Sequence, residues 1–567
     1  MPRGVRRNKS EAARSAGPHG EPLPLEFGAG LEEHPARMGA WALAAVFGLA
    51  FVAVRSALRW RVGRGALSLL FHDTWFHLLY AEEIAANGHR VPRRIRSFLL
   101  STHVAYPPLL HWALSFLPKR IRERTEPYWG GLLDALAGMA LLALASHLPG
   151  GTPATGAWAA GLLLATPALQ GTGWGPRALH GTPRVLGQLL FALAIFAFLL
   201  HRQTGAPGWF AAAAAAGSLI FVASFFSVQA FAFANLIAAA LLRSWEPLAL
   251  LGASFALSLL WFRGYALHLL RSQFRMLAAM RRALRRGQFD CAAIQARNRW
   301  RDFLRLPGYL RTDPRRAQEL ASRRNTWLIL LLQMPLVPAC FCVGGPTGGF
   351  ATGCLHDAGA YVWAGLALFA LTSLRPFLFL GEAERYAEHV LPLLCLTMAF
   401  ALPAAPPGLG AALPVGVLAV SVAVGVWNAR GFLRQERAGR ARQDQVRETL
   451  AWIQRQAVGR RFAVLPRGPL NLLIPYLAGG SVLYGQWASH SPPDVQALRN
   501  PESAEFARCR DGLFERFGID YVVLDVRRRE RPGFRDMFAA YPEAFGNAAF
   551  SVRAFRPPAA GHGSPAG

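Results

Sequence analysis

The sequence predicts an all-α membrane bundle of about 10–12 transmembrane helices, followed by a small soluble α/β domain. Of the 567 residues, 53% are hydrophobic and only 17% are charged, whereas soluble proteins carry about 25% charged residues. The apolar residues gather in blocks of roughly twenty, the length that crosses about 30 Å of hydrocarbon as a helix. After residue 427 the pattern changes to short apolar runs separated by polar stretches, which is typical of strands alternating with helices.

The N-terminal segment 1–38 is polar and rich in Pro, Gly and charge. It lacks the short apolar core and the cleavage site of a signal peptide. We therefore expect a disordered cytoplasmic tail, followed by a first helix that acts as an uncleaved anchor.

The membrane domain is expected to span residues 39–430. Its predicted helices are 40–58, 129–147, 157–169, 185–200, 209–225, 228–242, 248–262, 327–343, 360–378, 390–402 and 412–427. The fifth and sixth of these are short and nearly continuous. They could instead form one long tilted helix, or a span with a re-entrant turn. Either alternative would change the side of the membrane on which all later loops lie.

Two connections in this domain are unusually long. The first, 59–128, contains amphipathic pieces and a Tyr106-Pro107-Pro108 start to a helix. Loops of this length are usually functional or disordered, and the patterning favours helices on the membrane surface. The second, 263–325, is strongly basic. The positive-inside rule places it in the cytoplasm, but the helix count places it outside, and the rule weakens for loops longer than about sixty residues.

Residues 440–556 are expected to form the soluble α/β domain. Apolar runs at 461–465, 470–477, 481–484 and 520–525 read as strands of a mostly parallel sheet, with a helix at 504–517. Neither GxGxxG nor a P-loop is present, so nucleotide binding is not predicted. The Pro/Gly-rich tail 557–567 is expected to be disordered.

The net charge is +28, but it does not indicate nucleic acid as a partner. Most positive residues are arginines between apolar blocks, a pattern that fits lipid headgroups and anionic lipid-linked ligands. The six cysteines form no CxxC pair and no spaced Cys/His set, so neither a zinc site nor a disulfide framework is predicted.

The best candidates for chemistry are Asp73 and His77, just after the first predicted helix. Their spacing of four residues puts them on one face of a helix. A carboxylate beside an imidazole can accept a proton from a hydroxyl or hold a divalent metal. The alternative is that both are solvated residues at headgroup level.

The run HDTWFHLLYAEEIAANG at 72–88, followed by YPPLLHWALSFLP at 106–118, resembles the first external loop of the GT-C glycosyltransferases. This superfamily includes the oligosaccharyltransferase catalytic subunits, the protein O-mannosyltransferases and the bacterial aminoarabinose transferases. Its members use sugars carried on polyprenyl phosphate or diphosphate. The resemblance implies that Asp73 is the acidic residue central to catalysis, and Asp73 to His77 fits a D-x-W-x-H pattern.

Two later segments also resemble GT-C loops. Residues 173–184 resemble the second external loop and offer Arg177, His180 and Arg184 for substrate binding, but the usual acidic residue is missing. Whether a divalent metal, Mg or Mn, is a cofactor, with Asp73 as a ligand, therefore stays open. Residues 381–389 resemble the loop that contacts the donor phosphate or metal. In this segment the resemblance implies Glu384, Arg385 and Tyr386 as binding residues.

Tyr106 and His103, near the Pro-rich segment, complete the candidate set. For residues 381–389 the alternative is an ordinary charged loop, in which the side chain of Arg385 snorkels toward the membrane surface.

The resemblance implies an integral membrane glycosyltransferase with the active site and the C-terminal domain on the extracytoplasmic side of the bacterial inner membrane. Its expected partners are a polyprenyl-phosphate-linked sugar donor, a lipid, glycan or protein acceptor, and membrane lipids, but not nucleic acid. Asp73 and His77 are the expected catalytic residues. A transporter or flippase would need ionisable residues inside the helices, where Asp134 and Gln229 are the main polar candidates. A non-catalytic membrane scaffold is the third possibility.

Overall fold

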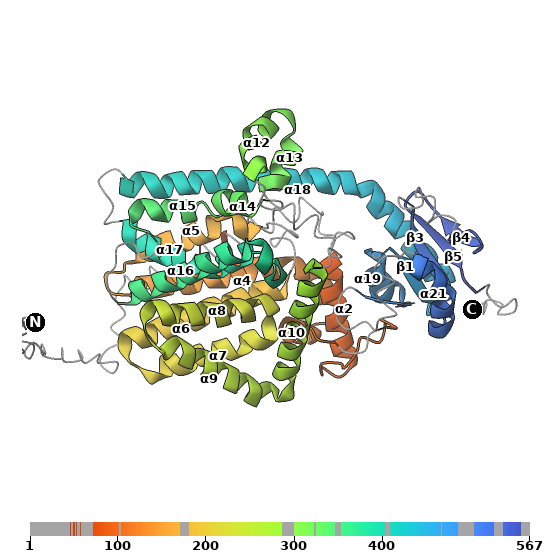
Figure 1. The fold of residues 1–567 in the computed structure, drawn as a ribbon, viewed down its shortest axis with the longest axis horizontal. Coiled ribbons are helices and arrows are strands. Elements are labelled where there is room, and N and C mark those ends of the chain that lie inside the picture. The colour runs from red at the N-terminus through yellow and green to blue at the C-terminus, as the bar shows by residue number, and fades with distance from the viewer. Residues whose placement is uncertain are drawn as a thin grey trace, which may run out of the picture.

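The computed structural model describes residues 72–100, 104–170, 181–285, 300–321, 325–345, 353–402, 409–466, 468–485, 504–526 and 537–556, with isolated positions between 46 and 57. An elongated helical bundle and a small sheet-containing domain lie at opposite ends of the chain's long axis (Figure 1). The long helix α18 (Leu409–Gln456) runs along the bundle and continues to the small domain. The predicted membrane bundle with a C-terminal α/β domain is confirmed.

Five described helices are long and apolar enough to cross a membrane. They are α4 (Lys119–His147), α6 (Pro183–Thr204), α8 (Phe225–Leu242), α16 (Cys354–Thr372) and the Ala412–Gly431 part of α18. The number rises to seven if each of two bent pairs is one span. These pairs are α9 (Glu246–Phe262) with α10 (Gly264–Arg285), and α14 (Thr326–Gln333) with α15 (Leu336–Cys340) and η4 (Phe341–Val343).

This count is lower than the eleven expected spans because two helices are short, a third is charged and the first expected span lies almost entirely outside the described residues. Some bundle helices are short: α5 (Pro153–Ala165) has 13 residues and α7 (Pro207–Ala223) has 17. Another, α17 (Glu384–Ala401), carries charged residues in its first turns. Every predicted span from 129 onward overlaps a helix. The first predicted span lies almost entirely outside the described residues, and the two predicted tails lie wholly outside them.

The fifth and sixth predicted spans are separate helices that turn back on each other at Ser224. Ser224 has extended backbone between α7 and α8. A Cβ on Gly217 of α7 would lie 3.0 Å from the ring of Phe231 in α8. In one continuous helix these residues would be about 21 Å apart at 1.5 Å per residue. The alternative of a single long helix is therefore wrong.

Small residues let the bundle helices approach closely, as is usual in membrane bundles. Gly187 of α6 lies against Ser224 and Ser227, and Gly365 of α16 lies against Val390 of α17. A Cβ on Gly365 would meet Val390 Cγ2 at 2.3 Å. These contacts fix α6, α8, α16 and α17 side by side.

The C-terminal domain contains a five-stranded sheet of order β2-β1-β3-β5-β4. Its strands are β1 (Arg461–Leu465), β2 (Ser481–Val482), β3 (Tyr521–Asp525), β4 (Glu543–Gly546) and β5 (Phe550–Ala554). The strand β1 pairs in parallel with β2 and β3, whereas β5 pairs antiparallel with β3 and β4. The sheet is therefore mixed rather than mostly parallel, because the hairpin β4–β5 adds to the β3 edge.

One predicted strand is wrong. Residues 470–477 form α19 (Leu470–Leu473) and the π-helical turn η7 (Ile474–Ala478). The predicted helix at 504–517 is α21 (Ala504–Phe517). A continuous apolar run does not distinguish a buried strand from a buried helical turn, which is why the periodicity misled here.

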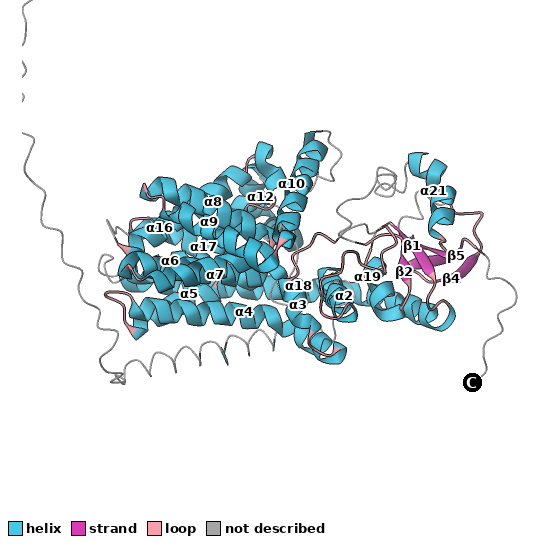
Figure 2. Cartoon of the chain, turned by 90° about the horizontal axis from the view of Figure 1, so that it is seen from below, coloured by secondary structure: helices cyan, strands magenta, loops and turns pink. Residues whose placement is uncertain are grey.

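The first long loop binds the C-terminal domain to the bundle. Its helix α2 (His72–Ala86) lies between the two parts (Figure 2), and its Trp75 packs on Tyr476 of the domain. The loop also extends the sheet at the β2 edge. The N–H of Val482 donates to the carbonyl of Ser97 at 2.9 Å, and the N–H of Leu99 donates to the carbonyl of Val482 at 2.9 Å.

The basic loop reaches the same end of the bundle. Its first helix, α10, turns by 118° from α9, and the hydroxyl of Tyr265 in α10 donates to the carbonyl of Tyr106 at 3.3 Å. The short helices α12 (Trp300–Thr312) and α13 (Pro314–Glu319) follow, and α13 contacts α18. The structure thus agrees with the helix count, which put both long loops on one side.

Candidate functional site

The described site candidates gather where the first loop meets the bundle. Tyr106 is half-buried among them and packs against the apolar core that the first loop shares with the C-terminal domain. Burial raises the pKa of its phenol, Asp73 raises it further, and Arg385 and Arg184 lower it. These three charged residues, from three separate segments, are therefore all within electrostatic range of one tyrosine.

Arg184 and Arg385 are positioned by two helices that begin side by side. Each is the second residue of its helix, α6 and α17 respectively. One turn further along, the Nε2 of Gln188 donates to the Oε2 of Glu388 at 2.9 Å. This bond sets the register of the two first turns.

Cations are unfavourable at these positions, because a helix N-terminus carries partial positive charge. Two arginines lie beside two helix N-termini, and Arg385 is also within electrostatic range of Glu382, Glu384 and Glu388. Helix N-termini are established anion-binding positions, and the guanidinium fork matches the geometry of phosphate oxygens. The arrangement suits a bound phosphate.

The segment before α17 holds Arg385 in place. Its guanidinium lies 4.0 Å from the ring centre of Phe226 and forms an ion pair with Glu382. Gly381, at φ 111°, permits this approach, since a Cβ there would lie 2.4 Å from the Phe226 ring. Its side chain is 17% exposed, so the arginine is packed inside the protein and does not snorkel to the surface.

The hydroxyl of Tyr386 is engaged in hydrogen bonding within the protein. Its hydroxyl donates to the Oε1 of Gln229 at 2.7 Å and lies 3.1 Å from the carbonyl oxygen of Leu380. Gln229, one of the two polar residues that a transporter would use, is thus bound within the bundle. Glu384 is buried in the first turn of α17, beside Arg385.

Asp73 lies in the first turn of α2, where the helix dipole favours a negative charge. His77 follows one turn later and is 3% exposed. Burial lowers the pKa of His77 to about 3, so its imidazole is neutral at physiological pH. His77 therefore offers hydrogen bonding to the site rather than a titrating charge.

The rings around His77 form a compact aromatic wall. Phe76 and Tyr106 have ring centres 5.0 Å apart, and Tyr80 and His111 are 4.8 Å apart. His111, in α3 (Leu109–Ser115), escaped the sequence analysis. The sequence feature that could have pointed to His111 is its position four residues after Pro107, in the same segment as Tyr106.

Three predicted site residues lie outside the described residues: His103, Arg177 and His180. Within the described part of the chain, no group of three or more His, Cys, Asp or Glu side chains is arranged to hold a metal ion. Asp73 as a ligand of a divalent metal therefore stays a prediction.

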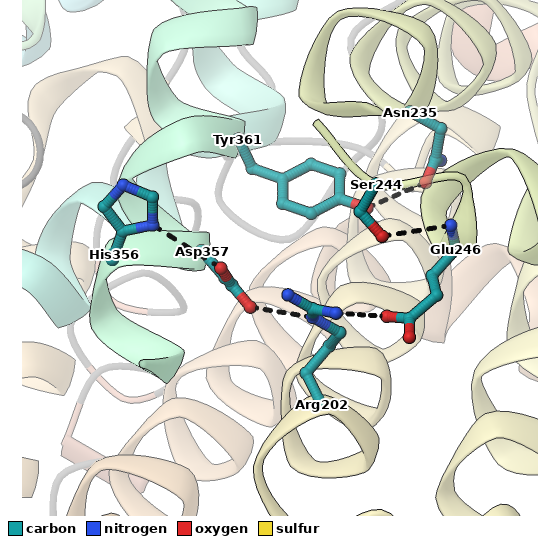
Figure 3. A network of polar contacts seen from close by, with 7 residues as sticks. All are labelled: Arg202, Asn235, Ser244, Glu246, His356, Asp357 and Tyr361. Carbon is teal, nitrogen blue, oxygen red and sulfur yellow. Dashed lines mark hydrogen bonds and ion pairs between the residues drawn. The ribbon is translucent and has the colours of Figure 1, made fainter. Parts of the chain in front are cut away.

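A second polar cluster (Figure 3) surrounds Arg202, at the opposite end of α6 from Arg184. Arg202 in the last turn of α6 bonds Asp357 through Nε at 3.0 Å and Glu246 through Nη1 at 2.5 Å. Beside it, the hydroxyl of Tyr361 donates to the Oδ1 of Asn235 at 2.8 Å. Arg184 and Arg202 are on one helix, about 27 Å apart at 1.5 Å per residue.

No protein-family model matches this chain, and no curated protein matches it in sequence. Solved structures do match it in fold. ArnT from Cupriavidus metallidurans bound to undecaprenyl phosphate superposes with a TM-score of 0.54 at 13% identity, over 89% of this chain and 97% of that one. ArnT in the apo state gives 0.52 at 15% identity, over 90% and 98%.

The archaeal oligosaccharyltransferase AglB from Archaeoglobus fulgidus, in complex with an inhibitory peptide and a dolichol-phosphate, gives 0.53 at 12% identity, over 88% of this chain and 72% of that one. These similarities confirm the GT-C fold that the sequence predicted.

Proposed function

We propose that this GT-C-fold chain is an integral membrane glycosyltransferase. It moves a sugar or glycan from a polyprenyl-phosphate-type carrier to an acceptor on the extracytoplasmic side of the bacterial inner membrane. The observation that carries the proposal is the pair of arginines at adjoining helix N-termini, with Asp73 within electrostatic range of the same tyrosine.

The fold gives this arrangement its context. ArnT was solved with undecaprenyl phosphate and AglB with a dolichol-phosphate, and both ligands join a phosphate to a long apolar chain. A site at the end of a membrane bundle suits such a ligand, because the phosphate can lie at the arginines while the chain stays in hydrocarbon.

The residues then have separate tasks in the transfer. The bond between the anomeric carbon and the carrier phosphate oxygen breaks, and its electron pair stays on that oxygen. Arg184 and Arg385 stabilise the resulting negative charge. The acceptor hydroxyl forms the new bond to the anomeric carbon, and its proton passes to the carboxylate of Asp73.

The C-terminal domain contacts the first loop through Trp75 and Tyr476, and the basic loop contacts it through Tyr265 and Tyr106, so both lie at the same end as this site. We therefore place both on the extracytoplasmic side with the acceptor. The C-terminal domain and the first loop determine which class of acceptor can bind: a lipid, a glycan or a protein.

The test uses the full-length protein in nanodiscs, supplied with membrane extract containing radiolabelled lipid-linked sugars. Asp73→Asn should reduce transfer about 10²- to 10⁴-fold, the usual contribution of a general base, with an unchanged melting temperature. The matched control is Asp444→Asn, an exposed carboxylate on α18 paired with Arg447, and it should leave transfer unchanged.

A separate measurement addresses the carrier. Undecaprenyl phosphate should raise the melting temperature of the wild type, as any ligand of the native state does, and should do so less in Arg385→Gln. Undiminished transfer by folded Asp73→Asn would overturn the catalytic assignment. Absence of any stabilisation by undecaprenyl phosphate would overturn the carrier.

A further inference from the structure

A chain of two histidines and one carbonyl lies behind the site. The Nδ1 of His77 is 2.9 Å from the Nε2 of His111. The Nδ1 of His111 is in turn 3.1 Å from the carbonyl oxygen of Pro107. His111 is fully buried and His77 is 3% exposed, so His77 is the one of the two residues with any exposed surface.

The chemistry of the groups fixes the direction of both hydrogen bonds. A carbonyl oxygen only accepts, so the proton of His111 is on Nδ1. In a neutral imidazole the other nitrogen is then an acceptor. His77 must therefore donate from its own Nδ1, and its Nε2 carries no proton. A positive charge on either ring would lie beside the other ring with no water to solvate it, which burial disfavours.

We propose that His111 is a positioning residue that holds His77 in the Nδ1–H tautomer, so that the bare Nε2 of His77 accepts a hydrogen bond from a substrate hydroxyl. This inference rests on the proposed function for the identity of the substrate, a sugar or a hydroxyl-bearing acceptor. The hydrogen-bond chain itself does not depend on that function.

The proposed role differs from acid–base catalysis. A bare nitrogen binds a hydroxyl, which can donate, but not an ionised phosphate, which can only accept. His77 would thus select the hydroxyl-bearing part of the substrate, while Arg184 and Arg385 select the phosphate. Asp73 and His77 lie one turn apart on the same face of α2, so the hydroxyl that His77 orients is next to the carboxylate.

The decisive experiment reads the tautomer directly. Protein with ¹⁵N-labelled histidine rings is examined by two-bond ¹H–¹⁵N correlation in nanodiscs at neutral pH, and His77 and His111 are assigned from His77→Gln and His111→Gln. Both rings should be neutral with the proton on Nδ1. A proton on Nε2 of His77, or a doubly protonated ring, would overturn the proposal, whether or not the protein transfers sugar.

Two variants at His111 separate positioning from simple packing. The amide of Gln can donate to the Pro107 carbonyl and accept from His77, so His111→Gln should keep the His77 tautomer. His111→Leu keeps an apolar side chain but can do neither, so His77 should lose its preference for Nδ1–H. The same Nδ1–H tautomer in His111→Leu would overturn the positioning role.

Transfer assays then connect the tautomer to function. His111→Leu should raise the KM for the hydroxyl-bearing substrate about three- to tenfold, the worth of one ordinary hydrogen bond, and His111→Gln should stay within about twofold of wild type. Equal losses in both variants, with the tautomer retained in His111→Gln, would show that the residue only packs and would overturn the proposal.

Discussion

The two ends of helix α6 carry arginines in opposite electrostatic settings. Arg202 is in the last turn, where a cation is favourable, and its two partners are in the first turns of α9 and α16, where anions are favourable. Arg184 is in the first turn, where a cation is unfavourable, and Arg385 occupies the same position in α17.

The comparison separates a stabilising cluster from a functional one. At the Arg202 end, each charge lies at a helix end that favours it, and the ion pairs join three helices (Figure 3). At the Arg184 end, two cations lie at helix N-termini, where the dipole disfavours them, and Arg385 is held there by Glu382 and Phe226. Proteins retain such locally unfavourable arrangements at functional sites. A change at one end of α6 should therefore leave the role of the other end unaffected.

The largest effect is expected at the Arg184 end. Replacing both arginines by Gln removes charge-assisted hydrogen bonds worth about 1.5–3 kcal/mol each, so transfer should fall at least about 10²-fold. The melting temperature should fall as well, because Glu382 loses its ion-pair partner and Glu384 and Glu388 lose a nearby positive charge, so transfer is expressed per folded molecule. Radiolabel transfer and thermal unfolding of Arg184→Gln/Arg385→Gln measure the two quantities. If transfer per folded molecule falls no further than in Arg202→Met, this end, too, is only structural.

At the Arg202 end, a substitution should lower the stability of the protein but not its activity. Arg202→Met leaves the buried carboxylate of Asp357 without its main partner, which should cost about 1.5–3 kcal/mol of unfolding free energy. Activity per folded molecule should stay unchanged. The matched control is Arg447→Met, where the ion pair is exposed and the cost should be below about 1 kcal/mol. Equal destabilisation by both variants would refute the structural role.

Acid should lower the stability of the folded protein, because His77 is buried in its neutral form. Its pKa is lowered to about 3 in the folded protein and is about 6.5 when unfolded. Between these values the unfolded chain binds the extra proton, so stability falls as pH falls. Between pH 7 and pH 5 this loss is about 2 kcal/mol for His77. His77→Gln should show a correspondingly smaller change in thermal unfolding, and an identical pH dependence would contradict the buried neutral state.

The smallest effect is expected at the rim of the Arg202 cluster. Glu246 is a third exposed, so water replaces much of its interaction with Arg202. Glu246→Gln should therefore cost no more than about 1 kcal/mol and leave transfer unchanged. If thermal unfolding shows that this variant is as damaging as Arg202→Met, the cluster depends on both carboxylates rather than chiefly on Asp357.

Local pattern was enough to predict the bundle, because each membrane helix must satisfy its own backbone hydrogen bonds and bury an apolar block of characteristic length. It therefore located every described span, and the resemblance at 72–88 and 381–389 pointed to Asp73 and Arg385. The same pattern misread 470–477 as a strand and missed the hairpin β4–β5, since short apolar runs have no period of their own.

Sequence alone determined that the chain crosses the membrane repeatedly, that its first loop is more than a connector and which acidic residue begins that loop. Only the tertiary structure decided that α7 and α8 turn back at Ser224, that Arg184 and Arg385 start adjacent helices, and that His111 lies behind His77. The physical reason is that hydropathy is a local property, whereas a site is made of residues far apart in sequence, brought together by packing. Spacing could predict the face of α2 but not what would lie against it.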